Sequence, residues 1–146
     1  MKIKVAWIGK TKEAAAQTLT DEYLGRIRHY ADVEGLALKD ETALLKMCSQ
    51  DTRLRHTLVL LDNRGREFSS EDFAKWLGDY QDRSPGPLLF AIGPANGFSD
   101  EARKAATLLL ALGKMTLAHE LARIVLLEQL YRAFTILKGH PYHLGH

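Results

Sequence analysis

The feature that most constrains the fold is a set of short, unbroken apolar runs separated by segments with helical periodicity. The clearest runs are Ile3–Ile8, Thr57–Leu61 and Leu88–Ile92. A strand with one face in water alternates apolar and polar residues, whereas a strand buried on both faces is apolar throughout. Strands of the second kind occur in parallel sheets that carry helices on both sides. The sequence therefore predicts an α/β fold with a mostly parallel sheet covered by helices on both faces.

Helix signals occupy the segments between these runs. An N-cap serine followed by acidic residues predicts a helix after Ser69 and a short one after Ser99. The longest helix is predicted over about 119–138, where Gly139 ends it. Weaker patterns predict a helix around 23–30, a strand at 33–38, a short helix at 41–52 and a loop at 62–65.

Length and charge limit the classes of function. With 146 residues the chain can hold one core, so we expect a single domain over residues 1–146. Lys and Arg number 20 against 18 Asp and Glu, a net charge of +2, so strong non-specific binding of free nucleic acid is not expected. Cys48 is the only cysteine, and no signal peptide or membrane-length apolar stretch is present. We therefore expect a soluble cytoplasmic protein.

Three loops at strand ends are candidates for a ligand site, namely residues 61–65, 93–97 and 113–117. Ligands of open α/β sheets bind at the carboxyl ends of the strands, and glycine lets backbone groups approach a ligand closely. One such loop is more often a simple turn, but three together favour a binding site. Neither a dinucleotide fingerprint nor a Walker A motif is present, and the first strand ends in Gly9-Lys10-Thr11 alone. Backbone groups that hold a neutral adenine and ribose are therefore favoured over a phosphate cradle.

The last part of the chain concentrates reactive side chains. An i,i+4 ion pair is the preferred interpretation of Glu128 and Arg132. His140, His143 and His146 are spaced by three residues, but no Cys, Asp or Glu ligand accompanies them. These histidines are interpreted as part of a tail, and no metal site is predicted.

The remaining histidines differ in their placement. His119 stands at the start of the longest predicted helix, beside the 113–117 loop, and is the better placed for a site. His29 and His56 are expected to be solvated surface residues.

Three stretches together resemble a known family. The first runs over 60–74 and begins Leu-Leu-Asp-Asn-Arg-Gly, the second is Ile-Gly-Pro-Ala-Asn-Gly-Phe-Ser over 92–99, and the third combines 115–119, 128–133 and 140–143. In this order, and over essentially the whole chain, they are similar to the ribosomal RNA large subunit methyltransferase H family of the SPOUT superfamily. The C-terminal third is the most specific part of the resemblance.

This resemblance implies several properties that no residue pattern shows. It implies a SPOUT-type fold with a deep C-terminal trefoil knot, although true knots are very rare among folds. It implies a homodimer with the active site at the subunit interface. S-adenosylmethionine would be the methyl donor, and N3 of a pseudouridine in the helix 69 stem-loop of 23S rRNA, within the assembled ribosome, would be the acceptor.

The family's motifs also indicate site residues. Arg132 is the candidate for binding the substrate or the anion that develops on it, whereas Tyr142 and His143 are candidates for orienting the base or relaying its proton. The cofactor-binding positions fall on the three strand-end loops, at Leu61, Gly93, Leu112, Gly113, Lys114, Met115, Thr116 and Leu117.

One departure from the family keeps alternatives open. The family usually has a basic residue after Pro-Tyr-His and then a short acidic end, where this chain has Leu144, Gly145 and His146. A protonated His146 is a partial substitute for the missing cation. The alternatives are a SPOUT methyltransferase that acts on another RNA, such as tRNA, and a ribosome-binding factor without catalysis. The near-neutral charge favours a preassembled ribosome over free RNA.

Overall fold

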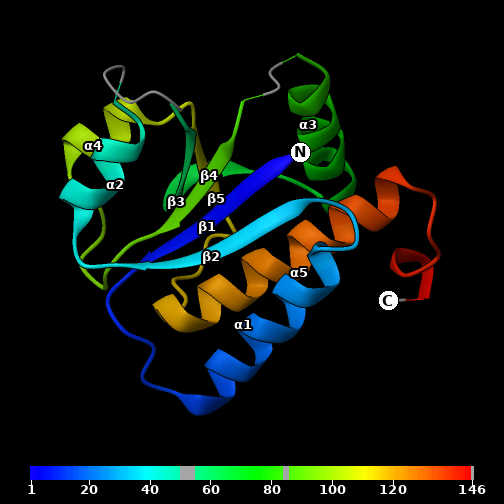
Figure 1. Cartoon of the computed structure of the whole chain (residues 1–146), viewed down its shortest axis with the longest axis horizontal. Coiled ribbons are helices and arrows are strands. Elements are labelled where there is room, and N and C mark those ends of the chain that lie inside the picture. Colours follow the sequence, from blue (N-terminus) through cyan, green and yellow to red (C-terminus); the bar gives the residue numbers. More distant parts are fainter. Residues whose placement is uncertain (50–54, 84–85, 146) are drawn as a thin grey trace.

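The computed structural model describes residues 1–49, 55–83 and 86–145 (Figure 1). Strands and helices alternate through these residues, and a 3-10 turn at His143–Gly145 follows the last helix. The strands are β1 (Lys2–Ile8), β2 (Asp32–Leu38), β3 (Thr57–Glu67), β4 (Leu88–Ile92) and β5 (Leu108–Ala111). The helices are α1 (Ala14–Ile27), α2 (Glu41–Met47), α3 (Ser70–Arg83), α4 (Asp100–Ala105) and α5 (His119–Leu137).

The strands form one parallel sheet in the order β2-β1-β4-β3-β5. Because all neighbours are parallel, their carboxyl ends lie along the same edge of the sheet. The central strand β4 is buried at all of its residues, in agreement with its continuous apolar sequence. The predicted α/β fold with a mostly parallel sheet is confirmed.

Helices cover both faces of this sheet. The first layer consists of α1, α3 and α5, and the second consists of α2 and α4 (Figure 1). Neighbouring residues of one strand face opposite layers: Val59 of β3 joins the core beneath the first layer, whereas Leu58 and Leu60 join the core beneath the second. Phe90 and Leu89 of β4 divide in the same way. Because both faces are packed there, adjacent positions in the buried parts of β3 and β4 are apolar.

The strand predicted at 57–61 is longer than the sequence indicated. The predicted loop at 62–65 lies inside β3, which continues to Glu67. Leu110 of β5 is the pairing partner of both Leu61 and Arg66, so the four residues between them form an irregularity in β3. Their polar side chains and Gly65 are typical of a turn, but pairing with β5 on both sides keeps the backbone in the sheet.

Helix starts follow the predicted capping signals. The Oγ atom of Ser69 accepts a hydrogen bond from the Asp72 backbone N–H at 3.0 Å, and Ser99 caps α4 in the same way. The longest helix ends close to its predicted boundary, with Gly139 at a positive φ of 70°. The helix predicted at 41–52 ends at Met47, and residues 50–52 lie outside the described part of the chain.

His56 corrects one expectation from the sequence. It was expected to be solvated, but it is buried, with Nδ1 3.2 Å from the backbone oxygen of Met47. The residue precedes β3 and lies against the end of α2, where packing of the second layer covers it. His29 is exposed, as expected. Separately, none of the described helices is long and apolar enough to cross a membrane.

Candidate active site

A cleft of about 760 Å³ opens where β4 and β5 end and where β3 shifts its register. All three loops predicted as candidates contribute to its wall, and the first turns of α5 complete it. The volume is within the range of small-molecule sites, roughly 300–1,000 Å³. Most of the positions that the family motifs indicate line this cleft: Leu61, Gly93, Leu112, Gly113, Met115, Thr116 and Leu117. Lys114 is exposed and does not line it.

Gly93 shapes the cleft because it has no side chain. A Cβ atom at this position would lie 2.8 Å from the ring of Phe98, which is itself buried. Beyond it the chain makes a tight turn, closed by a hydrogen bond from the N–H of Gly97 to the oxygen of Pro94 at 2.9 Å. Gly97 has a positive φ of 79°, a conformation that favours glycine. The glycine at 93 therefore lets the Phe98 ring pack directly against the backbone at the end of β4.

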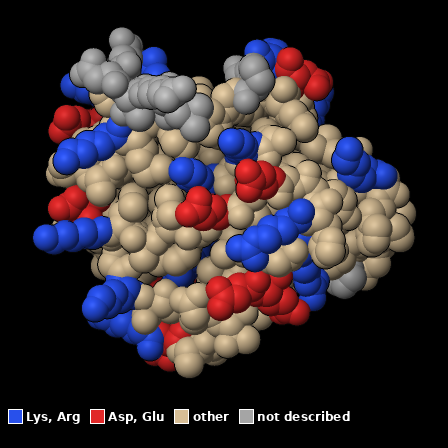
Figure 2. All heavy atoms as spheres, in the orientation of Figure 1, with Lys and Arg blue, Asp and Glu red and all other residues tan. Residues whose placement is uncertain are grey.

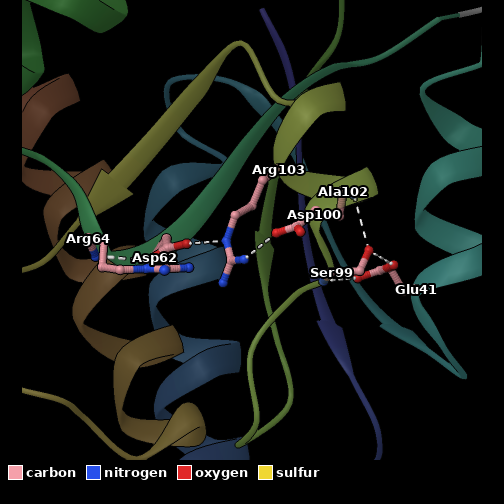
Figure 3. A network of polar contacts seen from close by, with 7 residues as sticks. All are labelled: Glu41, Asp62, Arg64, Ser99, Asp100, Ala102 and Arg103. Carbon is pink, nitrogen blue, oxygen red and sulfur yellow. Dashed lines mark hydrogen bonds and ion pairs between the residues drawn. The ribbon is translucent and has the colours of Figure 1, made fainter.

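An ion-paired carboxylate is one of the polar groups in the wall (Figure 3). Asp62 of β3 accepts a hydrogen bond from Nε of Arg103 at 2.8 Å and another from the backbone N–H of Arg64 at 2.8 Å. Burial opposes ionisation of Asp62, but these hydrogen bonds and positive charges outweigh it and lower its pKa. Arg103 also donates to Asp100 at 3.1 Å. The guanidinium of Arg103 thus connects α4 to Asp62 of β3 at the cleft wall.

The sequence indicated Asp62 only as part of the candidate loop at 61–65, and it carried no signal for Arg103. Arg103 has the local pattern of an ordinary surface residue of a short helix. A second unforeseen contact comes from Glu41 of α2, whose carboxylate accepts hydrogen bonds from the N–H and the hydroxyl of Ser99 (Figure 3). This contact fixes the start of α4 beside the cleft.

His119 lies at the cleft, where the sequence placed it. It begins α5 and lines the wall together with Ala122. Its Nε2 atom is 3.9 Å from the carboxylate of Glu120, the next residue of the helix.

The predicted catalytic residues meet in a separate cluster, which we call the tail network: Glu71, Glu128, Arg132, Tyr142 and His143. The predicted ion pair is confirmed, with Nη2 of Arg132 2.8 Å from Oε2 of Glu128. The Tyr142 hydroxyl donates to the same oxygen at 2.8 Å. Nη1 of Arg132 lies 2.8 Å from Nδ1 of His143, and the Nε2 atom of that ring is 2.7 Å from Glu71.

The donors and acceptors in this network determine which nitrogen of His143 carries the proton. A guanidinium has only donors, so Nδ1 of His143 accepts from Arg132, and Nε2 carries the proton that is donated to Glu71. Burial and the hydrogen bond to Glu128 raise the pKa of Tyr142 to about 12, so its phenol is protonated near neutral pH. The hydrogen bond to Glu128 likewise raises the pKa of Arg132 above its usual value.

Within one chain, the cleft and the tail network are apart. Ala122 faces the cleft and Arg132 lies ten residues further along the same helix, about 15 Å away at 1.5 Å per residue. The structure therefore does not bring Arg132, Tyr142 and His143 to the predicted cofactor positions of their own chain. The described residues contain no group of three or more His, Cys, Asp or Glu suited to a metal, and His146 lies outside them.

Comparison with known proteins identifies the family. A family model described as "Predicted SPOUT methyltransferase" matches residues 1–143. A protein of Koribacter versatilis, named ribosomal RNA large subunit methyltransferase H, is 56% identical over 146 residues that cover the whole of both chains. A protein of the same name from Geobacter sulfurreducens is 41% identical and aligns over 98% of this chain and 99% of its own.

Solved structures share the fold at low sequence identity. A SpoU methyltransferase from Streptomyces viridochromogenes, solved with AdoMet, has a TM-score of 0.53 and 13% identity over 90% of this chain and 57% of its own. A Legionella pneumophila protein solved with bound SAM has a TM-score of 0.50 and 20% identity over 91% of this chain and 66% of its own. From the family model and the full-length relatives together, the chain belongs to the SPOUT methyltransferase family and, within it, to the ribosomal RNA large subunit methyltransferase H family.

Proposed function

We propose that this protein transfers a methyl group from S-adenosylmethionine to N3 of a pseudouridine in the helix 69 stem-loop of 23S rRNA, within the assembled ribosome. The observation that carries the proposal is the convergence of three loops, distant in sequence, on one cleft at the carboxyl edge of the sheet. Family membership supports the same reaction, since the full-length relatives are named as large-subunit rRNA methyltransferases.

The cleft fits a nucleoside cofactor. Its wall combines apolar side chains, including Leu61 and Ile92, with the open backbone at Gly93. Such a surface suits a flat adenine whose polar edges bond to backbone groups. Leu61, Gly93 and the 112–117 loop would hold S-adenosylmethionine, with Lys114 at the exposed rim. When bound, the cofactor supplies the methyl group from its sulfonium centre.

The tail network supplies groups suited to the acceptor base. N3 of a pseudouridine is an imide nitrogen that has to lose its proton, and the guanidinium of Arg132 would stabilise the resulting anion. Tyr142, with its pKa of about 12, keeps its proton near neutral pH, so its hydroxyl is a hydrogen-bond donor suited to orienting the base. His143 can accept a proton at Nδ1 only after its hydrogen bond from Arg132 opens.

A homodimer would bring the two parts together. The distance between cleft and tail network in one chain favours an arrangement in which one subunit supplies the cleft and its partner supplies the tail. Met115, Leu117 and Leu121, at the cleft and the start of α5, are exposed apolar residues of the kind that interfaces cover. The trefoil knot, the cytoplasmic location and the absence of a metal requirement belong to the same proposal.

A methyl-transfer assay tests this function. Labelled S-adenosylmethionine and the purified protein are incubated with ribosomes from a strain that lacks the modification, and the labelled nucleotide is mapped by mass spectrometry. We expect label at a single pseudouridine of 23S rRNA, and none in ribosomes that already carry the methyl group. Label in tRNA instead would support the alternative RNA substrate. Cofactor binding without any turnover would support a non-catalytic ribosome-binding factor.

Variants test the assigned residues in the same assay. Gly93→Leu places a side chain against the Phe98 ring, so we expect loss of cofactor binding, measured by calorimetry. Arg132→Ala and His143→Ala should retain cofactor binding and lose turnover. If Gly93→Leu binds S-adenosylmethionine normally, the cofactor site is placed wrongly.

A further inference from the structure

The loop over residues 9–13, which joins β1 to α1, has no part in the site described above, but it lies at the edge of the cleft. The backbone N–H groups of Lys12 and Glu13 donate to the carboxylate of Glu120 at 2.8 and 3.1 Å. Glu120 directly follows His119, which lines the cleft. The first turn of α5, which lines the cleft at His119, therefore fixes this loop beside the cleft.

A second anchor holds the middle of the loop. The Thr11 hydroxyl accepts a hydrogen bond from Nη1 of Arg123 at 2.9 Å. Arg123 is 1% exposed, and its guanidinium carbon lies 4.1 Å from the centre of the Trp7 ring. Thr11 is thus held inward, while Lys10 and Lys12 on either side of it are exposed.

The two lysines are available for a partner. Among the described residues, neither Lys10 nor Lys12 takes part in an ion pair. The carboxylate of Glu120 is occupied by two backbone amides, and Glu13 is the one opposing charge within the loop. Figure 2 shows basic side chains over the loop between β1 and α1. Arg123 adds a positive charge beneath the loop, where burial reduces screening by salt.

We propose that Lys10 and Lys12 bind backbone phosphates of the RNA substrate at the edge of the cleft, an inference that rests on the proposed methylation of rRNA. An RNA strand presents a phosphate at every nucleotide, and contacts to phosphates set the register of the nucleic acid without reading its sequence. Because the loop is anchored at Thr11 and at Glu120, little backbone order has to be gained on binding. In a chain with a net charge of only +2, such local cations are the means of attracting RNA.

The test compares the variants Lys10→Ala, Lys12→Ala and the double variant with the full-length wild-type protein. Lys2→Ala is the matched control, because it removes the same charge from an exposed residue at the amino end of β1, away from the cleft edge. Ribosomes lacking the modification are the probe. Their affinity for the protein is measured between roughly 50 and 300 mM salt, a range over which screening of exposed charges increases strongly. Binding of S-adenosylmethionine is measured separately.

Counterion release sets the expected size of the effect. Each phosphate contact contributes about −0.7 to −0.9 to the slope of log affinity against log salt concentration. With this slope, and with no contribution at 1 M salt, one phosphate contact increases the affinity roughly four- to sixfold at 0.15 M salt. We expect each single variant to lose about this factor and about this slope, and the double variant to lose roughly 15- to 30-fold. Cofactor binding should be unchanged in all of them.

The outcomes separate this inference from the proposed function. If the wild-type protein methylates ribosomes but the double variant keeps the affinity and slope of Lys2→Ala, the phosphate contacts are refuted and the function stands. If the wild-type protein neither binds nor methylates ribosomes, the proposed function itself fails. Hydroxyl-radical footprinting decides whether the partner is RNA. The double variant should lose protection of a short rRNA segment, and unchanged protection with weaker binding would point to a ribosomal protein and overturn the inference.

Discussion

Gly65 offers a sharp test of how β3 and β5 fit together at the cleft. A Cβ atom added there would overlap the backbone carbonyl of Leu109 and would lie 2.5 Å from its carbon and 2.9 Å from the nitrogen of Leu110. Backbone atoms of a paired strand cannot turn aside as a flexible side chain can. In Gly65→Ala, β5 therefore has to move away from the register irregularity of β3.

The expected cost follows from overpacking, about 1–3 kcal/mol in the free energy of unfolding. Gly25→Ala is the matched control, since its added methyl group meets nothing within 4 Å in α1. Replacing a helical glycine by alanine should stabilise the protein by about 0.5–1 kcal/mol. The two variants should thus differ by about 1.5–4 kcal/mol in opposite directions from the wild type.

Urea unfolding followed by circular dichroism measures both variants under the same conditions. Because Asp62 and Arg64 precede Gly65 and line the cleft, Gly65→Ala should also weaken cofactor binding, whereas Gly25→Ala should leave it unchanged. A Gly65→Ala protein with the urea midpoint of the wild type would refute the close approach of these strands.

Two further variants test the polar groups. Asp62→Asn removes an ionised partner of Arg103 and should lower the stability at neutral pH. Because the pKa of Asp62 is lowered on folding, its contribution to stability is present above about pH 4 and is lost as the pH falls through the folded pKa. The urea midpoints of the wild type and the variant should therefore converge in acid. Convergence at neutral pH would contradict this role. Glu128→Gln leaves the half-buried Arg132 without its carboxylate and should lower the free energy of unfolding by about 1–3 kcal/mol. It should also return the pKa of Tyr142 toward 10, which ultraviolet titration measures. An unchanged tyrosine titration would show that Glu128 does not hold the tail.

The layer architecture was readable from local patterns. Continuous apolar runs such as that of β4 predicted a sheet buried on both faces, because burial on two sides leaves no polar position in a strand. The structure also confirms the predicted N-caps at Ser69 and Ser99 and the predicted helix end at Gly139. Each of these depends only on backbone groups within one helical turn. The candidate loops at the strand ends were also predictable, because parallel strands place their carboxyl ends on one edge of the sheet.

Long-range packing decided what the sequence could not. The residues at 62–65 have the composition of a turn, but pairing with β5 keeps them in β3. His56 resembles a surface residue until the end of α2 covers it. The same holds for Arg103, whose role at the cleft comes from a carboxylate 41 residues away in the chain.

The sequence by itself determined the class of fold, the position of the candidate loops and, through its motifs, the family. Only the tertiary structure showed that the loops share one cleft, that a buried Arg123 and Glu120 anchor the first loop beside it, and that the tail residues assemble about 15 Å away along α5. The physical reason is the range of the interactions. Capping, periodicity and turn formation act within a few residues, whereas hydrogen bonds and ion pairs between segments more than 40 residues apart depend on the path of the whole chain.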